Sequence, residues 1–136
     1  MTIEQELSKN VFKMMDLHNK FSEGLYEEMN SLYSNDFQGR LYMPWVDEVR
    51  HFNAENIKEG NKSAAEYYKG KNIQFAFTGL KIVPQSTNQA TVSYEVVHQN
   101  KEQVVMVRGL ALEVWRKESD GQWRIIRWYE EKGMRT

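Results

Sequence analysis

The sequence predicts a single α+β domain in which N-terminal helices close a strongly curved antiparallel sheet around a cavity. Helical periodicity is confined to the first half of the chain, and alternating strands joined by short turns fill the second half. The chain has 136 residues and no internal repeat or linker, so we expect one domain over residues 1–136. The expected order is helix, helix, strand, an optional second strand, helix, and four more strands.

Apolar residues recur at helical spacing over residues 3–33, with a break at 21–24. Ser22 is suited to cap a second helix over 23–32, because its hydroxyl can accept from a free backbone N–H. Asn53 is suited in the same way to cap a third helix, which we expect to bend at Gly60 and to stop near Gly70.

The strands follow from alternation and turn signals. Residues 37–43 alternate and end at Pro44, whereas 45–52 is either a loop or a short second strand. Asp120-Gly121 is typical of a hairpin turn. The four later strands are expected at 73–84, 90–99, 104–116 and 123–130, with a turn at 86–89 and a tight connection at 100–102.

The strand over 104–116 is apolar on nearly both faces. Ala111 and Trp115 lie on one face, and Leu110, Leu112 and Val114 lie on the other. An antiparallel strand with one face in water alternates more cleanly. We therefore expect the helices to cover one face and a second copy of the chain to cover the other, which predicts a homodimer through the sheet.

The composition excludes several classes of function. The net charge of −1 comes without a basic stripe, so a nucleic-acid partner is not expected. No apolar stretch is long enough to span a bilayer, and the first residues lack the pattern of a signal peptide, so we expect no membrane partner and a cytoplasmic location. Cysteine is absent and the three histidines are far apart in the sequence, so neither a metal nor a cofactor is expected.

Residues 107–130 resemble the C-terminal hairpin of the nuclear-transport-factor-two-like superfamily, in the style of its SnoaL-like and ketosteroid-isomerase-like branch. In that group a strand ending in an aromatic-basic pair, here Trp115-Arg116, meets a glycine turn and a Trp-x-Ile pattern, here Trp123 and Ile125. Residues 32–37 resemble the exit of the group's second helix into its first strand.

The resemblance implies a cone-shaped domain, often dimeric, with a cavity between the helices and the concave face of the sheet. Its members include isomerases, dehydratases, epoxide hydrolases, polyketide cyclases and non-catalytic binding or assembly domains, so it indicates a fold rather than an activity. Where some isomerases carry an acid before a proline, this chain has Met43 before Pro44. Asp47 and Glu48 are the nearest substitutes, and the catalytic residues stay unassigned.

Two histidines and a tyrosine are candidate ligand-binding residues. His98 shares a strand face with Tyr94 and is either a cavity residue or a half-exposed strand residue. His18 lies on the inner edge of the first helix, where a neutral imidazole either serves as a base at the mouth of the cone or packs against its neighbours.

The last strands add further candidates. Alternation places Arg127 and Tyr129 on the face of Trp123 and Ile125. The resemblance to the related hairpins implies that this face lines the cavity. A buried arginine needs a partner, and this partner is either Glu113 or the carboxylate of a ligand. The same alternation places Arg124, Trp128 and Glu130 on the outer face. Arg108 and Glu95 form either a cross-strand pair or polar walls of the pocket.

Three functions are consistent with this reading. The first is binding of a small apolar or carboxylate ligand in an interior pocket. The second is a cofactor-free isomerase, dehydratase or cyclase that works by acid–base catalysis, and the third is a non-catalytic dimerisation domain. The candidate ligand-binding residues are His18, Tyr94, His98, Arg108, Glu113, Arg127 and Tyr129.

Overall fold

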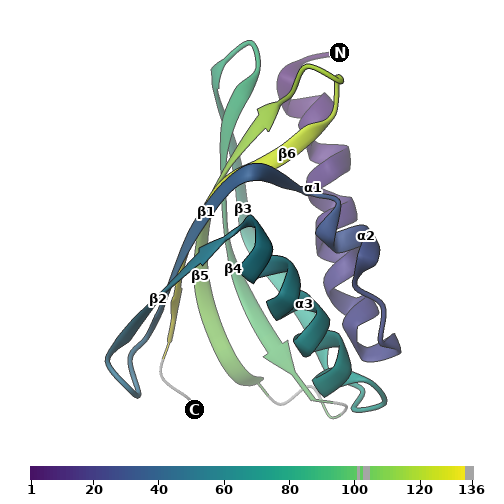
Figure 1. Ribbon diagram of the computed structural model, residues 1–136, viewed down its shortest axis with the longest axis vertical. Coiled ribbons are helices and arrows are strands. Elements are labelled where there is room, and N and C mark those ends of the chain that lie inside the picture. The colour runs from purple at the N-terminus through teal and green to yellow at the C-terminus, as the bar shows by residue number, and fades with distance from the viewer. Residues whose placement is uncertain (101, 103–104, 134–136) are drawn as a thin grey trace.

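The computed structural model describes residues 1–100, 102 and 105–133 and forms a curved sheet with helices on one side (Figure 1). Within these residues the sheet has the strand order β2-β1-β6-β5-β4-β3. The pair β1–β6 is parallel and the other neighbouring pairs are antiparallel. The predicted α+β class and curved sheet are confirmed, but the sheet is mixed rather than purely antiparallel, because β1 and β6 run in the same direction. The strands are β1 (Tyr33–Met43), β2 (Glu48–Asn53), β3 (Gln74–Ser86), β4 (Gln89–Gln99), β5 (Val105–Lys117) and β6 (Trp123–Lys132).

Helix α1 (Ile3–Asn19) begins with a capping box, in which the Thr2 side chain accepts from the backbone of Gln5 and the Gln5 side chain accepts from the backbone of Thr2. Its buried residues are spaced as the periodicity predicts. They are Leu7, Val11, Met14 and Leu17.

The predicted second helix over 23–32 is wrong. The chain makes a 3₁₀ turn, η1 (Lys20–Glu23), and then a single helical turn, α2 (Glu27–Asn30). Gly24 separates them at φ 79°, a left-handed conformation that ends η1. The break expected at 21–24 is present, but the helix after it begins at Glu27 rather than at Glu23 and makes only one turn.

Helix α3 (Ala54–Tyr68) begins at Asn53 as predicted, through a capping box with Asn56. It runs without a break through Gly60, where we expected a bend, and Gly70 follows it at φ 77°. No helix in the described part of the chain is long and apolar enough to cross a membrane. The predicted connection at 100–102 and the strand start at 104 lie partly outside the described residues.

Strand β6 carries one extra residue. Trp115 of β5 is opposite Ile125, but the next residue back along β5, Val114, is opposite Arg127. Ile126 therefore has no partner on β5, which defines a β-bulge. A bulge shifts the alternation by one residue, so the side chains after it face the opposite way.

This bulge overturns the predicted faces of the last strand. Beyond Ile126, Trp128, Glu130 and Lys132 line the concave side, whereas Arg127 and Tyr129 line depressions on the outer side. The expectation that Arg127 and Tyr129 share a face with Trp123 and Ile125 is therefore wrong, and so is the outer placement of Trp128 and Glu130.

Candidate functional site

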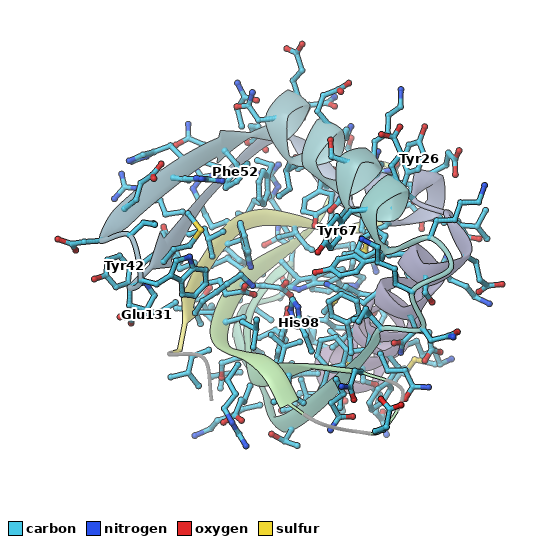
Figure 2. All side chains as sticks on the ribbon, turned by 90° about the horizontal axis from the view of Figure 1, so that it is seen from below. Tyr26, Tyr42, Phe52, Tyr67, His98 and Glu131 are labelled. Atoms are coloured by element: carbon cyan, nitrogen blue, oxygen red, sulfur yellow. The ribbon has the colours of Figure 1, made fainter. Side chains whose placement is uncertain are left out.

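A cavity of about 240 Å³ lies between α3 and the concave face of the sheet. Viewed along the cone, His98 lies inside the ring of sheet and helices, whereas Tyr42 and Glu131 lie outside β6 (Figure 2). The wall is mainly aromatic, which favours apolar contents. The aromatic lining residues are Phe21, Tyr33, Phe52, Tyr68, Phe75, Phe77, Tyr94 and Trp128.

The most unusual residue of this wall is Glu113, a carboxyl group that is only 4% exposed. Its Oε2 accepts from the Tyr94 hydroxyl at 2.8 Å, and its Oε1 accepts from the Trp115 indole N–H at 2.9 Å. Burial raises the pKa of Glu113 to about 7, with a smaller contribution from the charge of Glu130, although both hydrogen bonds act in the opposite direction. Protonated and ionised forms therefore coexist near neutral pH.

The alternation and register of β4 and β5 bring Glu113, Tyr94 and Trp115 together. Glu113 and Trp115 are two residues apart on β5 and face the same way, and Ala111 on the same face stands opposite Tyr94. The short side chain of Ala111 leaves space for Tyr94 to reach Glu113 across the sheet. The alternation of β5 thus places a carboxyl group against two hydrogen-bond donors inside an aromatic wall.

The bulge adds an ion pair to the same wall. Lys132 Nζ lies 2.9 Å from Glu130 Oε2, with the two side chains 18% and 10% exposed. Glu130 stands opposite Ala111 and Lys132 opposite Gly109, so small residues of β5 again make room for them. The cavity therefore has a carboxyl group at Glu113 and a paired charge at Glu130 and Lys132.

Two histidines complete the polar lining. His18 Nδ1 lies 2.9 Å from the Met14 carbonyl oxygen, so this nitrogen carries the proton and Nε2 is left as an acceptor. The His98 ring centre is 4.5 Å from that of Phe75. Burial lowers the pKa of both residues, that of His98 to about 3, so both imidazoles are neutral at pH 7.

Gly39 allows the cavity wall to close over β1. It pairs with Trp128, and a Cβ at Gly39 would lie 2.7 Å from Trp128 Cε3 and 2.9 Å from Phe37 Cζ. Both distances are shorter than van der Waals contact, so any side chain at this position would force Trp128 or Phe37 to move. The Trp128 ring in turn meets Phe52 of β2, with ring centres 5.8 Å apart.

The structure brings together four of the seven predicted site residues. His18, Tyr94, His98 and Glu113 line the cavity. Whether they bind a ligand stays a prediction.

Arg108, Arg127 and Tyr129 do not join them. Arg108 pairs with Glu95 at 2.6 Å on the outer face, the first of the two alternatives. Arg127 donates to the carbonyl oxygens of Asp36 and Ile126, at 3.1 and 2.6 Å. The suggested Arg127–Glu113 pair is wrong, because the bulge turns the arginine outward.

The acids near Pro44 are also outside the cavity. Asp47 accepts from the Tyr42 hydroxyl at 3.0 Å, and Glu48 pairs with Arg50 at 3.2 Å, both in exposed positions at the β1–β2 turn. Sequence reasoning missed Trp128, Glu130 and Lys132 as cavity residues. The available signal was the apolar doublet Ile125-Ile126, which interrupts strict alternation and is compatible with a bulge.

Among the described residues, no group of three His, Cys, Asp or Glu side chains is arranged to hold a metal ion. No protein-family model matches the chain. No curated protein matches it either.

Solved structures do match it. An NTF2-like protein of unknown function from Pseudomonas putida is 11% identical, with a TM-score of 0.76 over 94% of this chain and 84% of that one. A domain of unknown function with a cystatin-like fold from Nostoc punctiforme is 16% identical, with a TM-score of 0.73 over 98% and 80%. A ketosteroid isomerase-like protein from Erwinia carotovora atroseptica is 19% identical, with a TM-score of 0.64 over 98% and 99%.

These identities are too low to carry an activity from one protein to another. The structures nevertheless agree with this chain over more than nine tenths of its length. This agreement concerns the path of the backbone, including the helices on one side of the curved sheet, and therefore shows the fold alone. The chain has the nuclear-transport-factor-two-like fold.

Proposed function

We propose that this chain binds a small, mainly apolar molecule in the inner cavity and anchors one polar group of that molecule on Glu113 and Tyr94. The observation that carries this proposal is a buried carboxyl group, with a pKa raised to about 7, on the wall of an aromatic cavity. A titratable group whose pKa is strongly shifted by burial and that lines a cleft is a candidate for a functional site.

The charges of the wall favour a neutral ligand. The Lys132 ammonium is already paired with Glu130, both histidines are neutral, and the arginine expected to meet a carboxylate faces outward. A ligand carbonyl can accept from protonated Glu113, and a ligand hydroxyl can donate to its ionised form. The volume of about 240 Å³ is slightly below the common range for ligand pockets, which is roughly 300–1,000 Å³, so the ligand is small.

Native mass spectrometry of freshly purified protein tests this proposal, because a retained ligand adds a reproducible mass to the chain. Ala64→Phe should abolish the added mass, since Ala64 lines the cavity from α3 and the new ring fills it. Ser63→Phe is the matched control, because Ser63 is the exposed neighbour on the same helix. An added mass that survives Ala64→Phe unchanged would place the ligand elsewhere and contradict the proposal.

Acid–base catalysis is the second candidate, and the pKa of Glu113 favours it. A general acid or base works best when its pKa lies near the working pH, and Glu113 meets this condition beside a tyrosine hydroxyl that can stabilise a developing negative charge. A cofactor-free isomerisation, dehydration or cyclisation would use these two groups. A catalytically silent binding protein would use them only as hydrogen-bond partners.

The titration of Glu113 has a defined sign. Between pH 4.5 and about 7 the folded protein keeps a proton that the unfolded chain has lost, so Glu113 makes stability fall as the pH rises through this window. Glu113→Gln removes this effect. The stability of the variant relative to the wild type should rise from pH 5 to pH 8 by up to about 3 kcal/mol, measured by urea unfolding at both pH values.

Asp36→Asn is the control for this experiment. Hydrogen bonds from Arg116 and Ser34 lower the pKa of Asp36 to about 2, so its contribution to stability is constant above pH 5 and is lost only in acid. Its stability difference from the wild type should therefore be equal at pH 5 and pH 8. An equally flat result for Glu113→Gln would show that Glu113 titrates as an ordinary exposed carboxyl.

We also propose that the chain forms a homodimer through the outer face of the sheet. Large apolar side chains are exposed there around a groove of about 350 Å³. Such a patch on a small domain is typical of an interface, and a second copy offers the same surface about a two-fold axis. The exposed fractions are 63% for Leu110, 51% for Val49, 43% for Tyr129 and 41% for Leu112.

Light scattering after size exclusion tests the dimer. The wild type should have the mass of two chains, and Leu110→Glu should reduce it to one by placing a charge in the centre of the interface. Leu25→Glu is the matched control, since Leu25 is 51% exposed on the helical side and should leave the dimer intact. A wild-type mass of one chain at micromolar concentration would contradict the proposal.

A further inference from the structure

A second depression, of about 310 Å³, lies on the outer face of the sheet where β2, β1 and β6 meet the start of α3. It is separated from the inner cavity by the sheet itself. Its polar lining is basic or neutral and contains no carboxylate: Gln38, Arg40, His51, Asn53, Asn56 and Arg127. The chain as a whole has a net charge of −1, so this local excess of positive charge is not a general feature of its surface.

The arginines of the described residues divide into two groups. Those outside this depression each pair with a carboxylate: Arg50 with Glu48, Arg108 with Glu95, Arg116 with Asp36 and Glu118, and Arg124 with Glu118 and Asp120. In the described part of the chain, Arg40 and Arg127 have no such pair, and both line this depression. Two guanidinium groups without counter-charges are therefore held in one concave site.

Strand register explains why they meet. Gln38 of β1 is opposite Arg127 of β6, and Arg40 is opposite Tyr129 on one side and His51 on the other. Arg40 and Arg127 are therefore diagonal neighbours on adjacent strands and face the same way because of the bulge. The bonds from Arg127 Nη1 to the carbonyl oxygens of Asp36 and Ile126 hold its guanidinium in place.

The neighbouring groups add donors rather than acceptors. The Oδ1 atoms of Asn53 and Asn56 each accept a backbone N–H in the capping box of α3, which leaves their amide NH₂ groups as donors. The nearest acid along β1, Asp36, has its carboxylate bound by Arg116 and Ser34. No strong acceptor of this wall is therefore left to neutralise the two arginines.

We propose that this depression binds the oxyanion group, a carboxylate or a phosphate, of a small metabolite, at a site distinct from the inner cavity. Arginine matches both groups because its planar fork donates two parallel hydrogen bonds to two oxygens. Arg127 is the fixed donor, Arg40 is the exposed arm that closes on the anion, and Tyr129 supplies aromatic surface for the rest of the ligand. The apolar groove of the proposed dimer is adjacent to this depression and shares Arg40 and Tyr129 with it.

Titration with inorganic phosphate and with succinate tests this site. Binding is followed by the backbone amide chemical shifts, at constant ionic strength set with sodium chloride. At least one of the two anions should bind saturably with shifts confined to residues 38–40, 51–56 and 127–129. Phosphate alone would identify a phosphorylated ligand, and succinate alone a carboxylate. Arg40→Gln should raise the dissociation constant by about tenfold or more, because it removes a charge-assisted contact.

Arg50→Gln is the matched control, since Arg50 is an exposed arginine on β2, outside the depression and paired with Glu48. It should leave the dissociation constant within about twofold of the wild type. The Arg40 side chain makes no hydrogen bond or ion pair within the described residues, so Arg40→Gln should fold normally. Saturation by neither anion, or an equal loss of affinity in Arg40→Gln and Arg50→Gln, would overturn the proposal.

Discussion

The extra residue at Ile126 is the constraint on which the rest of this structure depends. A strand reverses its faces when one residue is inserted, so this position decides which half of β6 meets the cavity and which half meets the outer surface. Without it, Arg127 and Tyr129 would point toward α3, and Trp128, Glu130 and Lys132 would point to the outside. The extra residue adds Trp128 to the aromatic inner wall and Arg127 to the basic outer depression.

The bulge also determines which side chains of β6 surround Glu113. It places Trp128 opposite Glu113 and Glu130 opposite Ala111, next to Glu113 on the same face. Trp128 helps to exclude water, and the charge of Glu130 adds to the effect of burial on the pKa of Glu113. An arginine at this place would have lowered that pKa and made Glu113 half of an ordinary ion pair. The sheet instead keeps a carboxyl group near its point of half-protonation at neutral pH.

The fold could be predicted from the sequence because its signals are local and repeated. The cap at Asn53, the turn at Asp120-Gly121 and the alternation of residues 37–43 each indicate their element without help from distant residues. The site residues on β4 and β5 were also within reach, since Tyr94, His98 and Glu113 follow unbroken alternation up to the cavity. The break at 21–24 was predicted, but the extent of the second helix was not, because the apolar spacing of residues 25–32 is helical although only Glu27–Asn30 forms a helical turn.

The predicted faces of the last strand were wrong for a related reason. The same sequence around Ile126 is compatible with a bulge and with a regular strand, and only the pairing with the partner strands fixes the register. The outer basic depression depends on the same register, so no reading of β6 alone would have joined Arg127 to Arg40. The face on which a side chain lies after a bulge depends on the register with the partner strands, and the sequence of one strand does not determine that register.

The most direct test of this account is the titration of the Glu113 side chain, followed by the ¹³C chemical shift of its carboxyl carbon in protein labelled at glutamate. Assignment comes from the signal lost in Glu113→Gln. The account predicts a midpoint near pH 7, which requires a dry aromatic cavity around the carboxyl group. A midpoint near the ordinary value of 4.5 would show that water reaches Glu113, and would contradict both the buried anchor and the acid–base role built on it.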